Sequence, residues 1–310
     1  MAKQLIAVVG ADGFVGGGLA RALEAERIVY GPCGPGEVQV RRAGDLLARA
    51  DVVVNCGGFR VRPGCSLADY QRSHQGATSA LVPHLKPGAL LLHISSASVL
   101  GKGVGLGNRS TPNPATFPSP SYATAKLEED RYLEAASRER GFRVIFLRPA
   151  VVYSARGAGM VGTLLGLARR GIALRLYPRK ARHHLCHMDL LAEVARRAIA
   201  RGDLPNATCL VVADPYTVTN SDLEDLTRPA ARRPAVPVPL PLPWMSALLR
   251  LSPRSRHPRF DLRTQGEIFG VLHMDTVYDP SETFRLLDID PAGYGIERTL
   301  RPVVAEALRA

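Results

Sequence analysis

The sequence has few cysteines, few aromatic residues and no long apolar run. Its five cysteines among 310 residues are scattered, with no Cys-x-x-Cys pair and an odd total, so a disulfide framework is excluded and a reducing compartment is favoured. The apolar run at residues 5–9 is too short for the core of a secretory signal. Proline interrupts the longest later run, residues 235–249, which stays short of the roughly 20 residues that span a bilayer. We therefore expect a cytoplasmic protein with no stable membrane insertion.

The chain also has fewer acidic than basic residues, which gives a net charge of +12. A basic excess fits an anionic partner, such as a nucleic acid, a membrane surface or a phosphorylated small molecule. No basic run is interleaved with aromatic residues, which make up only 6% of the chain, and a single-strand binding groove needs such interleaving. We expect a small-molecule substrate and no nucleic-acid partner. The sequence leaves the oligomeric state open, with a homodimer as one option.

What the chain does contain is an alternation of apolar, strand-like runs with amphipathic helical stretches. This pattern is typical of a parallel sheet with crossover helices. We predict an α/β fold, with a Rossmann-type doubly wound parallel sheet and a smaller C-terminal substrate lobe. The predicted strands are residues 4–9, 27–30, 38–42, 51–55, 89–94, 144–147 and 208–213. The predicted helices are residues 14–26, 68–85 and 120–140, and residues 185–200 are expected to return to the first domain.

Two domains are expected from the change of character after the sixth predicted strand. The dinucleotide-binding domain is predicted to comprise residues 1–153 with 183–213. The substrate-binding lobe is predicted to comprise residues 154–182 with 214–310, and it holds most of the proline-dense sequence. The role of the Pro/Arg-rich segment 228–260 stays open, and a cover over the substrate cleft is our preferred interpretation of its proline-rich part.

A glycine-rich loop follows the first predicted strand directly and opens the first predicted helix. In such a loop the first glycine permits the tight turn, the second lets backbone approach a pyrophosphate, and the third lets helix pack on strand. The helix N-terminus then faces the anion. A turn without a ligand is the alternative, but the position between strand and helix favours a dinucleotide site. The predicted site consists of Gly10, Asp12, Gly13, Phe14, Val15 and Gly16.

The choice between NAD and NADP depends on the end of the second predicted strand. NAD recognition usually places an acidic side chain there, on the ribose diol. This chain has Tyr30-Gly31-Pro32-Cys33 instead, with Glu37, Arg41 and Arg42 nearby. The expected cofactor is therefore NAD or NADP, and the sequence does not decide between them.

Tyr122 and Lys126 lie four residues apart in a predicted helix that Ser119 caps and Pro120 opens. Four residues advance a helix by about one turn, so both side chains project from one face. A lysine ammonium beside a phenol favours the phenolate, which lets a tyrosine exchange a proton near neutral pH. A solvated helix face is the alternative interpretation of this pair.

Ser96 lies just beyond the predicted strand 89–94, at the sheet edge where doubly wound folds bind ligands. Its hydroxyl could bind a substrate oxygen and hold it against Tyr122. Simple turn chemistry is the alternative for a serine-rich strand end. We predict Ser96, Tyr122 and Lys126 as the catalytic residues.

As a set, these motifs resemble the extended short-chain dehydrogenase/reductases, in the epimerase/dehydratase-like branch. The resemblance covers roughly residues 4–213 and depends on Gly10, Gly13 and Gly16, Asp45-Leu46, Ser96, Tyr122 with Lys126, and Arg148-Pro149-Ala150-Val151-Val152-Tyr153. It implies a Rossmann domain with a C-terminal substrate lobe. It also implies that Asp45 and Leu46 lie by the adenine, Lys126 by the nicotinamide ribose and Pro149 beside the nicotinamide. Cys56 and Gly57 would form part of the cofactor's floor.

The departures from that family's pattern narrow the chemistry. The family often has His-Leu-Ala-Ala where this chain has Asn55-Cys56-Gly57-Gly58, which reshapes the cofactor's floor. Its 4,6-dehydratases carry an Asp-Glu pair where this chain has Ala97 and Ser98, which argues against dehydration. The segment Arg182-His183-His184 matches the nucleotide-sugar branch only loosely.

Three functions share this set of residues. We predict an NAD(P)-dependent oxidoreductase that transfers a hydride between nicotinamide and a secondary alcohol or ketone of a sugar-like or secondary-metabolite substrate. The alternative is a nucleotide-sugar epimerase with tightly bound NAD. A non-catalytic dinucleotide-sensing regulatory protein is the third, and the intact catalytic set argues against it. No metal site is expected, because no carboxylate completes a ligand set around His183, His184 and His187.

Overall fold

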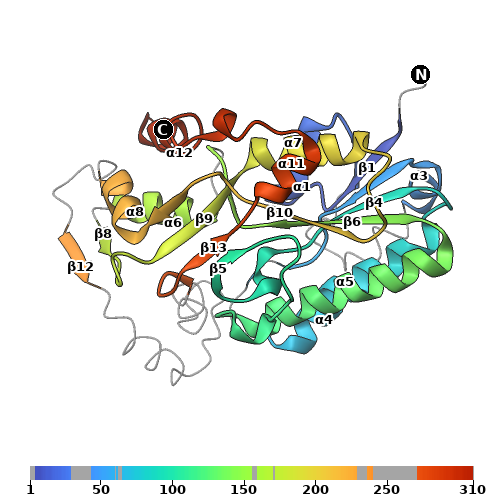
Figure 1. Ribbon diagram of the computed structural model, residues 1–310, viewed down its shortest axis with the longest axis horizontal. Coiled ribbons are helices and arrows are strands. Elements are labelled where there is room, and N and C mark those ends of the chain that lie inside the picture. Colours follow the sequence, from blue (N-terminus) through green and yellow to red (C-terminus); the bar gives the residue numbers. More distant parts are fainter. Residues whose placement is uncertain are drawn as a thin grey trace.

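A six-stranded parallel sheet forms the centre of the protein in the computed structural model (Figure 1). The structure describes residues 4–28, 43–59, 61, 65–155, 159–169, 172–228, 236–239 and 271–309. The strand order is β2–β1–β3–β4–β6–β10, and every neighbouring pair is parallel. This arrangement confirms the predicted Rossmann-type sheet. The strands are β1 (Ile6–Val9), β2 (Glu26–Ile28), β3 (Val52–Asn55), β4 (Leu90–Ile94), β6 (Arg143–Pro149) and β10 (Thr208–Val212).

Helices cover both faces of this sheet, as Figure 1 shows. Because successive strand residues point to opposite faces, Val8 and Leu92 pack into one hydrophobic core, whereas Ala7 and Leu91 pack into the other. The first core lies under α1 (Phe14–Ala22), α7 (Met188–Ala200) and α11 (Ser281–Leu287). The second lies under α3 (Gly44–Arg49), α4 (Leu67–Leu81) and α5 (Pro120–Arg140).

The order of the strands reverses beside β1. From β1 the chain crosses to β2 on one side and later returns to β3 on the other side. In open α/β sheets, ligands bind outside the carboxyl ends of the strands at such a switch point. The segments that follow β1 and β3 are therefore the first place to look for a cofactor site.

A second sheet lies beyond the carboxyl edge of the first. It contains β11 (Thr217–Thr219), β9 (Arg182–His187), β13 (Thr276–Tyr278) and β5 (Gly103–Leu106) in that order, with β7 (Val151–Tyr153) beside β9. Separately, β8 (Ile172–Arg175) pairs with β12 (Val236–Pro239). A third hydrophobic core joins β7 and β9 to α6 (Gly159–Arg169), α8 (Asn220–Thr227) and α12 (Leu300–Arg309). The predicted division into two domains stays a prediction.

Several predicted boundaries were wrong. The first helix ends at Ala22 instead of residue 26, because Glu24 has a φ of +50° and β2 begins two residues later. The helix predicted at 68–85 ends at Leu81 and continues as the 3₁₀ helix η1 (Val82–His84). Ser119 does stand before α5, but its side chain makes no capping bond to that helix. The strand predicted at 38–42 lies outside the described residues. The other 3₁₀ helices are η2 (Ala97–Leu100), η3 (Pro114–Thr116) and η5 (Pro291–Tyr294).

None of the helices in the described part of the chain is long and apolar enough to cross a membrane.

Candidate active site

The glycine loop after β1 has no room for side chains at two of its positions. Gly10 has a φ of +78°, and a Cβ there would lie 3.0 Å from the carbonyl oxygen of Cys56. A Cβ at Gly16 would lie 2.1 Å from the carbonyl oxygen of Gly10, well inside van der Waals contact. Both glycines are therefore required by the backbone itself, as the tight turn between strand and helix predicts.

Backbone hydrogen bonds hold this loop against β2. The N–H groups of Gly10 and Ala11 donate to the carbonyl oxygen of Ile28 at 2.9 and 3.1 Å, and the Arg27 guanidinium donates to the Ala11 carbonyl at 2.8 Å. Asp12 and Gly13 are exposed at the N-terminus of α1. The next two residues, Phe14 and Val15, are half-buried in its first turn. Exposed backbone at a helix N-terminus fits the pyrophosphate of a dinucleotide.

The segment after β3 lies beside the loop. Cys56 contacts Gly10, and the Gly57 N–H donates to Asn55 Oδ1 at 3.0 Å. Burial raises the pKa of the Cys56 thiol to about 12, and the charge of Lys126 acts against that shift. Cys56 follows β3, and Ile94, whose carbonyl accepts a hydrogen bond from Lys126 Nζ, ends the neighbouring strand β4. The predicted floor and the predicted catalytic lysine meet at the carboxyl edge of the sheet.

Ser96 follows β4 at the same edge and begins η2. It is half-buried, and its Oγ accepts hydrogen bonds from the N–H and the hydroxyl of Ser98 at 3.2 and 2.9 Å. Since Oγ is the acceptor in both contacts, the hydroxyl proton of Ser96 remains for a substrate oxygen. Pro149 ends the neighbouring strand β6 and is paired with Val212. Ser96 and Pro149 therefore both follow central strands at their carboxyl ends.

Lys126 is anchored inside the protein by two hydrogen bonds. Its Nζ donates to the carbonyl oxygen of Ile94 at 3.1 Å and to Glu129 Oε2 at 3.0 Å, and the residue is only 4% exposed. The Ile94 contact ties α5 to the end of β4, two residues before Ser96. An ammonium group has three donors, so one N–H of Lys126 remains. Tyr122, one turn earlier on α5, packs its ring against Tyr70 and His74.

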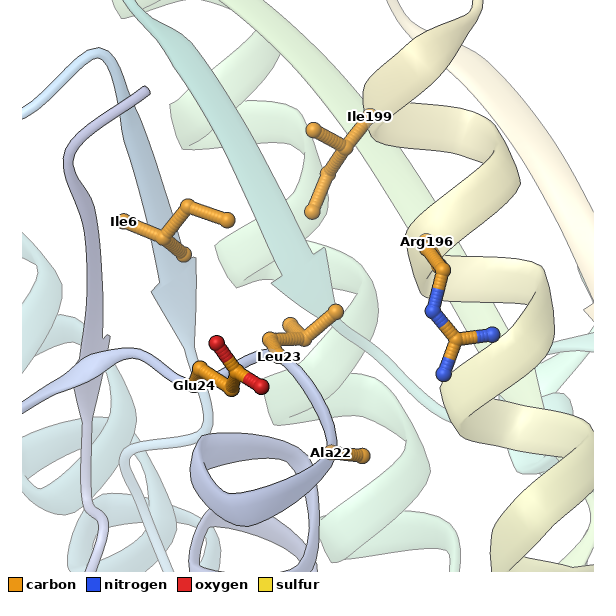
Figure 2. Close-up of a pocket in the computed structure, with 6 residues that line it drawn as sticks. All are labelled: Ile6, Ala22, Leu23, Glu24, Arg196 and Ile199. Atoms are coloured by element: carbon orange, nitrogen blue, oxygen red, sulfur yellow. The ribbon is translucent and has the colours of Figure 1, made fainter. Parts of the chain in front are cut away.

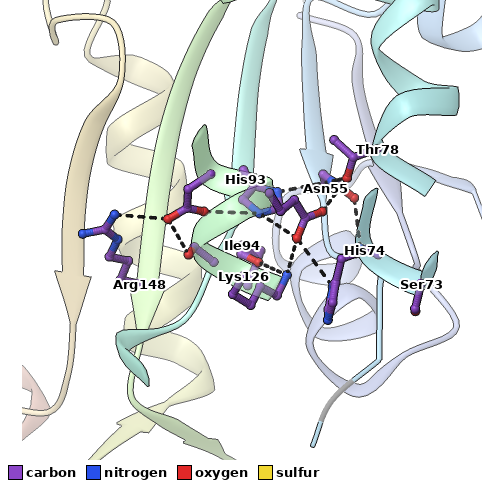
Figure 3. Close-up of polar contacts among 12 residues, drawn as sticks. Asn55, Ser73, His74, Thr78, His93, Ile94, Lys126 and Arg148 are labelled. Carbon is purple, nitrogen blue, oxygen red and sulfur yellow. Dashed lines mark hydrogen bonds and ion pairs between the residues drawn. The ribbon is translucent and has the colours of Figure 1, made fainter. Parts of the chain in front are cut away.

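Lys126 belongs to a buried group of ionisable side chains, which we call the Lys126 cluster: Lys126, Glu129, Asp130, His74, His93 and Arg148 (Figure 3). Asp130 accepts hydrogen bonds from Ser95 at 2.9 Å and from Arg148 at 3.1 Å. Burial raises the pKa of Asp130, with Arg148 acting against it. Burial likewise lowers the pKa of His74 to about 3. His74, His93, Glu129 and Asp130 were not among the residues predicted from the sequence.

The structure does not bring Asp45 and Leu46 together with the glycine loop. Both lie on α3, and β3 begins three residues after that helix ends. A Cβ at Gly44 would lie 2.7 Å from the His84 ring, and Lys86 donates to the Arg49 carbonyl at 3.0 Å. These contacts place α3 at the amino edge of the sheet, whereas the glycine loop lies at the carboxyl edge. The Asp-Leu pair of the sequence thus stands in a different place from the other predicted site residues.

A hollow of about 260 Å³ also lies at the amino edge (Figure 2). It is lined by Ile6 of β1, the end of α1 and two residues of α7, Arg196 and Ile199. Ile6 is the first residue of β1, and the glycine loop begins after the last one. This hollow is therefore separate from the predicted active site.

Two of the histidines considered as metal ligands, His183 and His184, have structural hydrogen-bond partners. His183 contacts Asn220 Oδ1 at 3.0 Å and Thr276 at 3.2 Å, and His184 Nδ1 accepts the Tyr278 N–H at 2.8 Å. These bonds join β9 to β13 and α8. Within the described ranges, no three histidine, cysteine or carboxylate residues gather as a metal site would require.

A second buried polar group, the Asp214 cluster, joins the two sheets: Asp214, Tyr153, Tyr216, Thr299 and His187. Asp214 Oδ2 accepts the Tyr153 hydroxyl and Oδ1 accepts the His187 N–H, each at 2.8 Å. Tyr216 continues the chain to Tyr153 at 3.0 Å and to Thr299 at 2.8 Å. Burial raises the pKa of Asp214 against these bonds.

Comparison with known proteins gives one family. The model of the NAD dependent epimerase/dehydratase family matches residues 35–209, a span that includes Ser96, Tyr122 and Lys126 but not the glycine loop. No curated protein sequence matches the chain.

Solved structures share the fold at low sequence identity. UDP-glucuronic acid 4-epimerase from Bacillus cereus, solved with NAD, has a TM-score of 0.72 and 16% identity, with 99% of each chain covered. The human epimerase family protein SDR39U1 (isoform 2), solved with NADPH, has a TM-score of 0.73 and 18% identity, with 97% of this chain and 99% of that one covered. UDP-glucose 4-epimerase from Thermotoga maritima, solved with UDP-glucose, has a TM-score of 0.69 and 17% identity, with 98% of each chain covered.

Proposed function

The chain belongs to the NAD dependent epimerase/dehydratase family, and on this basis we propose that it transfers a hydride between a nicotinamide dinucleotide and a secondary alcohol or ketone. The substrate proposed is a small molecule of sugar-like or secondary-metabolite type. The enzyme would act in the cytoplasm as a reductase or dehydrogenase, with its cofactor exchanged in each cycle.

The cofactor would be held at the switch point between β1 and β3. A dinucleotide bound there supplies the hydride donor or acceptor at its nicotinamide ring. The exposed backbone of Asp12 and Gly13 at the start of α1 would bind the pyrophosphate. Cys56 and Gly57 would form the floor, and Pro149 would lie beside the nicotinamide. Asp45 and Leu46 are left out of this set because they lie at the other edge of the sheet.

The protein's own residues would handle the proton that accompanies the hydride. The Tyr122 hydroxyl would give a proton to the substrate oxygen in reduction and take it back in oxidation. Ser96 would donate its remaining proton as a hydrogen bond to the same oxygen. The remaining N–H of Lys126 would bind the nicotinamide ribose.

The observation that carries this proposal is the hydrogen bond from Lys126 Nζ to the Ile94 carbonyl. It fixes the Tyr122–Lys126 face of α5 at the end of β4, where Ser96 follows two residues later. That edge also carries the glycine loop and the Cys56 segment. A solvated helix face would not hold a lysine at 4% exposure.

The first test is to denature the purified protein and quantify any dinucleotide that is released. An empty protein that binds NADH or NADPH reversibly supports the proposal, and the tighter binder identifies the coenzyme. Near-stoichiometric NAD contradicts cofactor exchange and supports an epimerase, which regenerates its cofactor in place. Binding without turnover supports a sensor. A protein that neither carries nor binds either nucleotide contradicts the cofactor site.

A matched pair of glycine variants checks where the nucleotide binds. Gly16→Ala should reduce NADH and NADPH affinity by more than about tenfold, because its Cβ displaces the Gly10 carbonyl. Gly76→Ala on α4 meets no atom within 4 Å and should bind as the wild type does. Equal nucleotide affinity in both variants would show that the cofactor does not bind at the glycine loop.

A further inference from the structure

Glu129 gives Lys126 a counter-ion inside the protein. Its side chain is fully buried on α5, one turn after Lys126, with Oε2 at 3.0 Å from Nζ. A buried carboxylate is stable only when it is paired and hydrogen-bonded. Side chains from two other elements complete the pairing: the Thr78 hydroxyl of α4 donates to Oε1, and two histidines approach Oε2. The hydride transfer proposed above assigns no role to this carboxylate.

The contacts around Glu129 extend to the floor of the cofactor site. Asn55 accepts the Gly57 N–H, and its Nδ2 donates to Thr78 Oγ1 at 3.4 Å and to His93 Nδ1 at 3.2 Å. Because an amide nitrogen only donates, His93 Nδ1 is an acceptor in this contact. In the neutral ring, Nε2 then carries the proton, and it lies 3.4 Å from Glu129 Oε2. Residues from α4, β4 and α5 thus meet at one carboxylate, and Asn55 of β3 contacts two of them, as Figure 3 shows for the labelled side chains.

We propose that Glu129 is a positioning residue for Lys126, which it keeps charged and in place beside Ile94 so that one N–H remains for the nicotinamide ribose. This inference rests on the proposed function, since only cofactor binding gives that N–H a task. It assigns Thr78, Asn55 and His93 the role of holding Glu129.

Charge balance around Lys126 explains why a carboxylate is needed. Burial lowers the pKa of Lys126, but Glu129 and Tyr122 raise it, and the net result is a raised pKa. The other ionisable groups in this neighbourhood are Asp130 of α5, His74 of α4, His93 of β4, Cys56 after β3 and Arg148 of β6, which pairs with Asp130. Without Glu129, the effect of burial would dominate, and Lys126 would lose its proton at a lower pH.

The first arm of the test titrates Lys126 in the cofactor-free protein. The chain has five lysines, so ¹⁵N-lysine NMR can follow the Lys126 amine from about pH 6 to about pH 10, assigned by its loss in Lys126→Met. The wild-type Lys126, whose pKa is raised, should stay charged throughout this range, whereas in Glu129→Gln its titration midpoint should fall within it. In Glu129→Asp, which keeps the charge, the midpoint should stay closer to the wild type. The control Glu128→Gln changes a half-buried neighbour that pairs with Gln71, and it should titrate as the wild type does. An unchanged midpoint in Glu129→Gln overturns the inference.

The second arm measures NADH and NADPH affinity by nucleotide fluorescence over the same pH range. The wild type and Glu128→Gln should show little change, whereas Glu129→Gln should lose about tenfold or more as its Lys126 deprotonates. Lys126→Met should be weak at every pH. A Glu129→Gln affinity that is reduced equally at all pH values would indicate a merely structural role and overturn the inference. If the wild type binds neither nucleotide, the proposed function fails, and the lysine titration still decides whether Glu129 controls Lys126.

Discussion

The Lys126 cluster and the Asp214 cluster are both buried and polar, but they are satisfied in different ways. In the Asp214 cluster the carboxylate oxygens each accept a bond of 2.8 Å, and two tyrosine hydroxyls and a threonine continue the network. In the Lys126 cluster the histidines are paired less closely: His74 Nδ1 lies 3.5 Å from Glu129 Oε2, and His93 Nε2 lies 3.4 Å from the same oxygen and 3.7 Å from Asp130 Oδ1. The Asp214 cluster is closed by short hydrogen bonds, whereas the Lys126 cluster combines hydrogen bonds with ion pairs and with longer histidine–carboxylate contacts.

This difference distinguishes the Asp214 cluster, which has a structural role, from the Lys126 cluster, which has the features of a functional site. Buried polar groups in proteins are nearly always hydrogen-bonded, so the exceptions need an explanation. Buried polar groups that are imperfectly paired are candidates for a functional role. The Asp214 cluster meets the expectation for a structural joint between two sheets. The Lys126 cluster, which contacts Tyr122 and the cofactor floor, meets the expectation for a site.

The largest effect is expected from Tyr122→Phe. It removes the hydroxyl that exchanges the substrate proton, and general acid–base catalysis contributes about 10²- to 10⁴-fold in rate. NADH and NADPH affinity should stay within about twofold of the wild type. Turnover of the alcohol or ketone that the wild type accepts is the measurement. Tyr132→Phe, an exposed tyrosine on the same helix, is the control and should keep full activity. Full activity in Tyr122→Phe would show that Tyr122 does not exchange the substrate proton.

Lys126→Met should give the largest loss of folding stability. It leaves Glu129 buried without its cation, which costs about 3–5 kcal/mol. The double variant Lys126→Met/Glu129→Gln should recover part of that loss, and the non-additivity is read from a double-mutant cycle of unfolding free energies. Lys86→Met is the matched control, because the Lys86–Asp51 pair is about 40% exposed and should contribute less than about 1 kcal/mol. Additive losses would show that the cluster is not held by charge.

The folding stability of Lys126→Met should change with pH in the opposite direction to that of the wild type. Burial alone would raise the pKa of Glu129, but Lys126 and His93 outweigh it and hold the pKa well below its ordinary value of 4.5. In the wild type this carboxylate therefore contributes stability above pH 4.5 and loses it as the pH falls. In Lys126→Met burial dominates, the pKa rises, and stability should increase as the pH falls. The difference in unfolding free energy between the wild type and Lys126→Met should therefore narrow at acidic pH.

The chemistry-bearing motifs could be predicted from the sequence because each is local. The glycine loop is defined by its position between a strand and a helix, and Tyr122 and Lys126 are defined by helical spacing. Asp45 and Leu46 were assigned by the family's motif alone. In the structure they lie on the short helix α3 that precedes β3. A motif that lacks its structural context can stand at the wrong edge of the sheet.

The rest of the site depends on packing between distant segments. His74 and Glu129 meet only because α4 packs on α5, and Thr78 reaches Glu129 across 51 positions of sequence. Two signals were present: Glu129 lies three residues after Lys126 on a helix, and His93 interrupts an apolar strand. The pairing of β5 with β13 joins residues about 170 apart, and strands that short carry too little periodicity to be predicted.

A pair of glycine variants tests how tightly the Lys126 cluster is packed. Gly58 and Gly88 both have positive φ values, +107° and +80°. A Cβ at Gly58 would lie 2.0 Å from His74 Nδ1, whereas one at Gly88 would meet nothing within 4 Å. Gly88→Ala should lose about 1–2 kcal/mol through backbone strain, and Gly58→Ala should lose a further ~1–3 kcal/mol from overpacking. Unfolding free energies measure both.

The His74 ring explains why glycine stands at position 58. Adding His74→Ala to Gly58→Ala should therefore cost less than the two single changes predict together, because the smaller side chain makes room. Equal losses in Gly58→Ala and Gly88→Ala would contradict close packing at His74.

The smallest effect is expected from Asp214→Asn. The amide oxygen can keep the His187 N–H, and the amide nitrogen can donate to Tyr153 while the hydroxyls of Tyr153 and Tyr216 reverse toward Thr299. The network stays complete, so the unfolding free energy at neutral pH should change by no more than about 1 kcal/mol, and turnover should be unaffected.

The pH series then separates the two kinds of buried carboxylate. Because burial raises the pKa of Asp214 above 3.8, its ionisation costs stability as the pH rises from that value, and Asp214→Asn should gain relative to the wild type over the same range. Asp203 is the control of opposite sign: Arg201 lowers its pKa, so Asp203→Asn should lose relative to the wild type as the pH rises. A large loss of stability or activity in Asp214→Asn would show that the protein requires the charge of Asp214. The contrast between the Asp214 cluster and the Lys126 cluster would then be wrong.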